Sequence, residues 1–167
     1  QLARLARWIA AAGGTVVVPE NSGLPSSAEF AGGVAPADSS EMRPTLGYGQ
    51  FAERGGFHVM ETPTEHWLET LTGLAATGVE LVVAMAGRAP LQTHPFVPVL
   101  QLANRAAAEA AGDAGDMDLL LENSAPDWAE PLLARIGETL DGRHTPRLQR
   151  KGNADVQFTR GWFGFSL

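Results

Sequence analysis

The sequence predicts an α/β fold of Rossmann-like type, with a mainly parallel sheet flanked by helices. Residues 57–60 form a short apolar run, residues 67–75 repeat apolar side chains at helical spacing, and residues 79–85 form an almost unbroken apolar run. This pattern indicates a strand, a helix and then a strand that is buried on both faces of a sheet. Such a unit implies a parallel sheet with a right-handed crossover.

The segment before this unit shows the same alternation of helix and strand. Apolar residues between positions 2 and 12 share one helical face, and the glycine pair at 13–14 ends that helix. The run Thr-Val-Val-Val at 15–18 is β-branched and predicts a buried strand. Residues 22–56 are rich in glycine, proline, serine and alanine without a period, so we expect an irregular loop segment.

The helix of the central unit has a clear sequence signal at its start. Thr62 suits the N-cap, Pro63 suits the first helical position, and Glu65 suits the acidic position of a capping box. Gly78 is placed to end the helix.

The chain after the central unit continues the alternation. Asn104 is placed to cap a short alanine-rich helix that Gly112 ends, and Ser124 is placed to cap a longer one. The predicted elements are a strand at 97–102, a helix at 105–111, a strand or helical turn at 119–121 and a helix at 126–140. The side chains expected to face inward on the last helix are Trp128, Leu132, Leu133, Ile136 and Leu140.

Length and composition limit the classes of protein that remain. The 167 residues fit a single α/β domain that spans positions 1–167. The net charge of -7 and the lack of a basic stripe argue against a nucleic-acid partner. The absence of cysteine excludes disulfides and thiolate metal sites, and no apolar run reaches transmembrane length. We therefore expect a cytoplasmic protein, and the missing initiator methionine is compatible with a fragment of a longer chain.

Three charged residues follow the predicted strands. Glu20, Glu61 and Arg88 each stand at a strand's carboxyl end, where open parallel sheets bind ligands. If these strands are neighbours, the arginine suits the carboxylate of a hydroxy-acid substrate, and the glutamates suit a base or ligands of a hard divalent cation. The structural alternative is a loop Glu20, a Glu61 that supports the helix start, and an Arg88 paired with one of them.

His94 stands close to Arg88 in a loop bounded by glycine and proline. This position suits a role in proton transfer or as a ligand. A loop histidine that bonds only to backbone explains the same pattern.

A set of short motifs carries a family resemblance. The chain has a glycine pair before a valine-rich strand that ends in Glu, and a tail of the form Gly-x-x-Gly. Between them lie Met60-Glu61-Thr62-Pro63, Gly87-Arg88, His94-Pro95 and Asp116-Met117-Asp118. In this order and spacing, the motifs resemble the C-terminal region of the altronate and galactarate dehydratase family. The resemblance covers most of the chain apart from residues 22–55.

The resemblance implies a hydro-lyase domain, that is, a carbon–oxygen lyase that removes water from sugar acids. A related branch cleaves sulfolactate. The implied catalytic residues are Glu61 and His94, and the implied substrate-binding residues are Arg88 and Thr62. The implied cofactor is a divalent cation such as Fe²⁺, with Glu20 as a candidate ligand. The family fold also implies a parallel sheet with a knotted crossing.

The implied partners are a small hydroxy-acid substrate, an N-terminal domain or partner subunit, and further copies of the same chain. Three departures from the family pattern support an alternative function. The family's Asp is Glu61 here, Ala89 replaces a loop glycine, and the segment 22–55 differs. The alternative is a non-catalytic binding or assembly domain that retains the fold.

Overall fold

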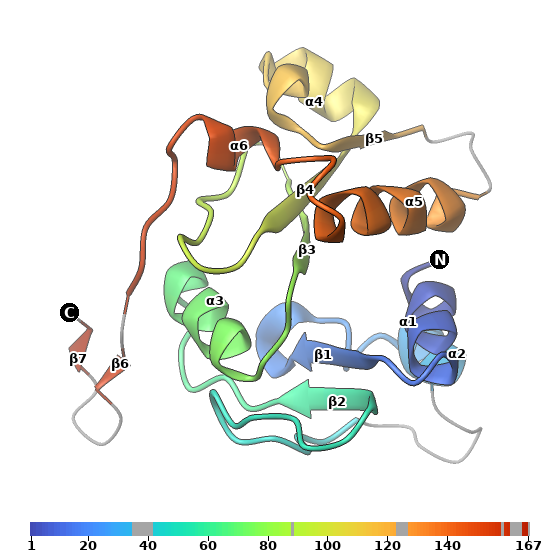
Figure 1. The fold of residues 1–167 in the computed structure, drawn as a ribbon, viewed down its shortest axis with the longest axis vertical. Helices are drawn as coiled ribbons and strands as arrows, with labels where there is room; N and C mark the ends of the chain where they lie inside the picture. Colours follow the sequence, from blue (N-terminus) through green and yellow to red (C-terminus); the bar gives the residue numbers. More distant parts are fainter. Residues whose placement is uncertain (35–41, 88, 123–126, 158, 161–164, 167) are drawn as a thin grey trace. The chain divides into compact units, whose positions relative to one another are not determined.

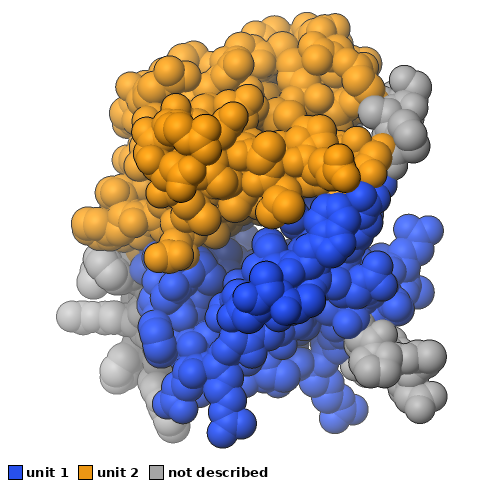
Figure 2. Space-filling view, turned by 45° about the vertical axis from the view of Figure 1, so that its right-hand side comes forward, with its two compact units in different colours: residues 1–79, 158–167 blue, residues 80–157 orange. Residues whose placement is uncertain are grey.

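The computed structural model describes residues 1–34, 42–87, 89–122, 127–157, 159–160 and 165–166 (Figure 1). Contacts divide the chain into two compact units, which Figure 2 shows in different colours. Unit 1 comprises Gln1–Val79 with Phe158–Leu167, and unit 2 comprises Glu80–Gln157. Each unit contains a small parallel sheet with helices around it, which confirms the α/β fold class. The single-domain assignment stays a prediction.

Unit 1 is built on a parallel pair of strands. β1 pairs with β2 so that Thr15 lies opposite Gly56 and Pro19 lies opposite Met60. The helices α1 and α2 lie side by side (Figure 1). The elements are α1 (Leu2–Ala11), β1 (Thr15–Pro19), the 3₁₀ helix η1 (Glu20–Ser22), α2 (Ala28–Val34), β2 (Gly56–Met60) and α3 (Trp67–Ala76), with the antiparallel pair β6 (Thr159–Arg160) and β7 (Phe165–Ser166).

α2 corrects the expectation that residues 22–56 are irregular throughout. Its first turn is supported by Ser27, whose hydroxyl accepts the amide hydrogen of Phe30 at 3.3 Å. Phe30 is buried, and its ring packs 5.9 Å from the ring of Phe57, measured between centroids. The helix has only seven residues, so it offers too few turns for a periodic apolar pattern to stand out in the sequence.

α3 begins later than the capping pattern predicts. Its first residue is Trp67, and the N-cap residue His66 makes no side-chain capping bond. The hydroxyl of Thr62 accepts the backbone N–H of Asn21 at 3.0 Å instead. The hydroxyl predicted to cap the helix is therefore bonded to a residue distant in the sequence. The helix begins at Trp67, four residues after the predicted first position Pro63. Gly78, at φ +91°, follows the helix end as predicted.

Unit 2 is built on three parallel strands in the order β3–β4–β5. This corrects the strand–helix–strand unit expected at 57–85, because β2 pairs with β1 and β3 pairs with β4 in a separate sheet. β3 is also shorter than the apolar run and is not buried throughout, since Met85 is 50% exposed. The central strand β4 (Val99–Asn104) is almost entirely buried, as its apolar sequence predicts. The other elements are β3 (Val82–Met85), α4 (Arg105–Ala111), the 3₁₀ helix η2 (Ala114–Asp116), β5 (Leu119–Leu121), α5 (Ala129–Leu140) and α6 (Arg147–Arg150).

The two main helices of unit 2 fit their predictions unequally. Asn104 caps α4 by accepting the amide hydrogen of Ala107 at 3.1 Å, as expected. On α5, Leu132 is fully buried, but Leu133 and Leu140 are exposed, which contradicts the predicted inward face. α5 buries a narrower stripe than its apolar residues would allow. The predicted cap Ser124 lies outside the described residues.

No helix among the described residues has both the length and the hydrophobicity that crossing a membrane requires.

Candidate functional site

The carboxyl ends of β1 and β2 bring two predicted site residues to one edge of the unit 1 sheet. Pro19 and Met60 are register partners at the ends of the two strands, and Glu20 and Glu61 follow them directly. Both glutamate side chains are exposed. Glu20 and Glu61 therefore lie at the same edge of the sheet, as predicted from their positions after two neighbouring parallel strands.

Asn21 joins the two strand ends. Its backbone N–H donates to the hydroxyl of Thr62 at 3.0 Å, and its side-chain Nδ2 donates to the carbonyl of Thr64 at 2.8 Å. Nδ2 also lies 3.4 Å from the hydroxyl of Thr70, which is 3% exposed. Thr62 thus belongs to this edge of the sheet together with Glu20 and Glu61. Sequence reasoning missed Asn21, although it directly follows a strand end that the same reasoning used.

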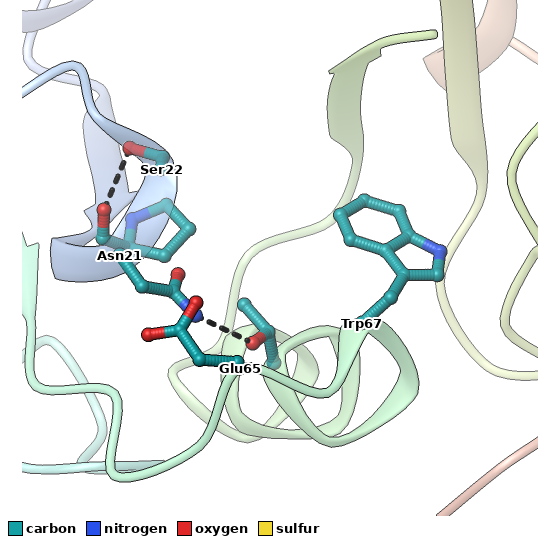
Figure 3. A pocket seen from close by; sticks show the side chains of 6 residues that line it. Asn21, Ser22, Glu65 and Trp67 are labelled. Atoms are coloured by element: carbon teal, nitrogen blue, oxygen red, sulfur yellow. Dashed lines mark hydrogen bonds between the residues drawn. The ribbon is translucent and has the colours of Figure 1, made fainter. Parts of the chain in front are cut away.

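A pocket opens beside this edge. It has a volume of about 210 Å³ and is lined by Pro19, Asn21, Ser22, Glu65, Trp67 and Thr70. Figure 3 shows Asn21 and Ser22 on one side and Trp67 on the other, with Glu65 between them. Ligand pockets for drug-sized molecules have volumes of roughly 300–1,000 Å³, so this one suits a small ligand. The sequence held no signal for the pocket, because its lining joins the segment around the end of β1 to the start of α3, and these segments are distant along the chain.

The polar groups of the pocket differ in how far their hydrogen bonds are satisfied. The hydroxyl of Ser22 donates to the carbonyl of Pro19 at 2.7 Å and accepts from the N–H of Leu24 at 3.3 Å. Glu65 is exposed, and its carboxylate has no hydrogen bond or ion pair within the described part of the chain. The pocket therefore offers at least one anionic acceptor to a ligand.

His94 belongs to unit 2, in the loop between β3 and β4. It is 1% exposed, and its Nδ1 accepts the backbone N–H of Phe96 at 3.3 Å. Burial lowers the pKa of His94, because an imidazolium loses its hydration there. The ring is therefore neutral at pH 7, and Nε2 carries its proton since Nδ1 accepts.

Two fixed points hold the loop that carries His94. The fully buried side chain of Gln101 accepts from the N–H of Leu91 at 2.8 Å and donates to the carbonyl of Leu91 at 2.6 Å. The hydroxyl of Thr93 donates to the carbonyl of Asn153 at 2.6 Å. Sequence reasoning missed Gln101, whose signal is a lone amide inside an apolar strand. Arg88, the predicted carboxylate-binding residue of the same loop, lies outside the described residues.

The motif at residues 116–118 supplies a buried carboxylate at the start of β5. Asp118 accepts the backbone N–H groups of Gln101 and Arg147 and the Nε2 of His144, each at 2.9 Å. Nδ1 of His144 faces Nη1 of Arg135 at 3.0 Å. A guanidinium only donates, so Nδ1 accepts and Nε2 carries the hydrogen that Asp118 receives. These bonds give Asp118 a structural role in unit 2.

The residues that the structure describes do not form a complete metal site. Within the described parts of the chain, no group of three His, Asp or Glu side chains lies close enough to hold a metal ion. Glu20, the candidate ligand, is therefore not part of such a group. The divalent cation stays a prediction.

The structure thus places the predicted site residues in three ways. Glu20, Glu61 and Thr62 share one edge of the unit 1 sheet. His94 lies in unit 2, and Arg88 lies outside the described residues. The catalytic and binding roles of all five stay predictions.

A search of curated proteins finds no match to the chain. A family model described as D-galactarate/altronate dehydratase, C-terminal, matches residues 20–162. The match covers all five predicted site residues and most of both units. The chain therefore belongs to the D-galactarate/altronate dehydratase family, as its C-terminal domain.

Proposed function

We propose that this chain is the C-terminal domain of a hydro-lyase that removes water from a sugar acid. One observation supports the proposal above the others. The family match begins at Glu20, at the edge of the sheet where two exposed carboxylates stand beside a pocket with hydrogen-bonding walls. This arrangement is suited to a small polyhydroxylated ligand.

The proposed reaction acts on two neighbouring carbons of the sugar acid. A base takes the proton from the carbon next to the carboxylate, and the electron pair forms a carbon–carbon double bond. The hydroxyl on the following carbon leaves with a proton as water. The resulting enol tautomerises to a 2-keto-3-deoxy acid. General base and general acid groups each contribute about 10²–10⁴-fold to such proton transfers.

Our proposal assigns these steps residue by residue. Glu61 is the base, because its carboxylate is exposed beside the carboxyl end of β2. His94 takes part in proton transfer through Nε2, the atom that carries the proton of its neutral ring. Arg88 binds the substrate carboxylate in a forked pair.

Thr62 contributes a hydroxyl to the substrate in this proposal. The oxygen accepts from Asn21, which leaves the hydroxyl hydrogen to donate. A divalent cation such as Fe²⁺, with Glu20 as a candidate ligand, also belongs to the proposal. The described residues do not complete its site, and no step above depends on it.

The test uses the full-length protein with galactarate, altronate and sulfolactate. Keto acid formation is followed under anaerobic conditions, with and without added Fe²⁺. We expect turnover of at least one sugar acid and a loss of about 10²–10⁴-fold in kcat on Glu61→Gln. The matched control is Glu53→Gln, which changes an exposed glutamate outside the pocket.

Two results would contradict the proposal. Full activity of the Glu61→Gln protein would remove Glu61 from the chemistry. Absence of keto acid from every substrate would favour the alternative function, a non-catalytic binding or assembly domain. Ala89→Gly then tests whether the altered loop explains the missing activity.

We also propose the setting in which the domain works. It operates in the cytoplasm as a homo-oligomer, together with an N-terminal domain or a partner subunit. The absence of cysteine is compatible with a reducing compartment. Light scattering of the full-length protein measures the number of copies directly.

A further inference from the structure

We infer that the unit 1 pocket binds the hydroxyl-bearing end of the sugar acid and disfavours a second carboxylate there. The protein would therefore prefer an aldonate, which ends in a hydroxymethyl group, over an aldarate, which ends in a second carboxylate. The identity of the ligand rests on the proposed function. The direction of the preference rests on the lining of the pocket.

The size and the walls of the pocket suit a short hydroxylated chain. Its volume of about 210 Å³ corresponds to about seven water molecules at roughly 30 Å³ each. Trp67 and Pro19 give apolar walls for the carbon–hydrogen groups of the ligand. Asn21 and Glu65 give polar walls for its hydroxyls.

The orientation of the Asn21 amide makes the pocket rich in acceptors. The carbonyl of Thr64 can only accept, so the side-chain atom 2.8 Å from it is the nitrogen Nδ2. The second hydrogen of Nδ2 is directed to the hydroxyl of Thr70. Oδ1 of Asn21 has no donor within the described part of the chain. Oδ1 and the Glu65 carboxylate therefore need donors, and hydroxyl groups supply them.

The charge of the pocket opposes a second carboxylate. Glu65 is the charged residue of the lining, and no lysine, arginine or histidine contributes to the lining among the described residues. Glu20 and Glu61 add two more exposed carboxylates at the same edge of the sheet. A like charge at about 4 Å in bulk water opposes binding by a factor of about five. We expect discrimination of at least this size.

The experiment compares altronate with galactarate on the full-length protein. The dissociation constants come from calorimetry, and kcat/KM is measured wherever turnover occurs. We expect the wild-type protein to bind altronate at least about fivefold more tightly than galactarate. Glu65→Gln should reduce this ratio about fivefold by improving the binding of galactarate. Glu53→Gln, an exposed control outside the lining, should leave the ratio unchanged.

Intrinsic fluorescence localises the binding. Altronate should change the emission of Trp67, so Trp67→Phe should abolish the change. Trp8→Phe should preserve it, because Trp8 does not line the pocket. A signal that survives Trp67→Phe, or a wild-type protein without a preference for altronate, would overturn the inference. The inference would also be overturned if Glu65→Gln did not change the ratio of the galactarate and altronate dissociation constants, or if altronate did not bind.

The failures of the two proposals can be distinguished. Keto acid formation from both substrates with no effect of Glu65→Gln leaves the proposed function standing and removes the pocket inference. Selective binding of altronate that depends on Glu65, without keto acid formation, leaves the pocket inference standing and removes the proposed activity.

Discussion

Replacing Asp118 by asparagine tests how much of unit 2 depends on one buried carboxylate. The substitution keeps the shape of the side chain and converts one acceptor oxygen into a donating NH₂ group. Oδ1 of Asp118 accepts from His144 and from the N–H of Arg147, and Oδ2 accepts from the N–H of Gln101. Each orientation of the new amide therefore brings a donor against at least one donor.

The least costly orientation of the new amide can be worked out from the neighbours. His144 cannot become the acceptor, because its other nitrogen already accepts from Arg135. In the Asp118→Asn protein the NH₂ group therefore turns towards Gln101, whose N–H on the central strand loses its acceptor. An unsatisfied buried donor costs about 1–3 kcal/mol, and hydrogen bonds to charged groups contribute about 1.5–3 kcal/mol. We expect a loss of about 2–4 kcal/mol in the free energy of unfolding.

Urea unfolding of the full-length protein measures this loss. With a slope of about 2 kcal/mol per molar urea, the midpoint should fall by about 1–2 M. The matched control is Asp116→Asn, which removes a surface ion pair with Lys151. Exposed pairs contribute about 0–1 kcal/mol, so the control midpoint should move by less than about 0.5 M. Equal shifts in the two variants would refute the assignment of Asp118 as the anchor of unit 2.

Two further predictions concern stability. Burial lowers the pKa of His94 in the folded state. Below about pH 6.5, the unfolded chain therefore binds a proton that the folded chain does not. As the pH decreases from there to the folded pKa, the free energy of unfolding decreases. The free energy of unfolding changes by at most about 1.4 kcal/mol per pH unit in this range. Urea unfolding at several pH values should show a smaller pH dependence for His94→Gln than for the wild-type protein. The exposed control His66→Gln should keep the wild-type pH dependence, and equal behaviour of the two variants would contradict the prediction. On α5, Leu132→Ala should cost about 2–5 kcal/mol because it empties a buried site, whereas Leu133→Ala should cost less than about 1 kcal/mol because Leu133 is 40% exposed. Urea midpoints decide this pair, and similar costs would mean that the burial pattern of α5 is wrong.

Local patterns predicted the elements that depend on neighbouring residues. The cap at Asn104 was correct, because the capping bond spans three residues and needs no other part of the chain. The strands at 15–19 and 56–60 were found because β-branched and apolar runs favour strands wherever they pair. The strand–helix–strand unit at 57–85 was wrong as a single sheet, because β2 pairs with β1 and β3 pairs with β4 in separate sheets. Local patterns locate strands but do not choose their partners.

Patterns failed where a distant partner competed for the same group. Thr62 looks like a helix cap, but Asn21 donates to it from forty-one positions away along the sequence. Leu133 and Leu140 share a helical face with Leu132 in the sequence pattern, but only the packing of α5 decides which of them are covered. Such choices depend on which surfaces meet, and a single sequence does not contain this information.

Residue patterns were sufficient for the α/β class, the order of most elements and the presence of carboxylates after two strands. Those features follow from periodicity, β-branching and glycine positions, which act over a few residues. Folding in three dimensions was needed to join the strand ends through Asn21 and to turn Glu65 and Trp67 towards a common pocket. It was also needed to bring Gln101, Arg147 and His144 to the carboxylate of Asp118. These arrangements require long-range hydrogen bonds, whose partners are chosen by the packing of whole elements.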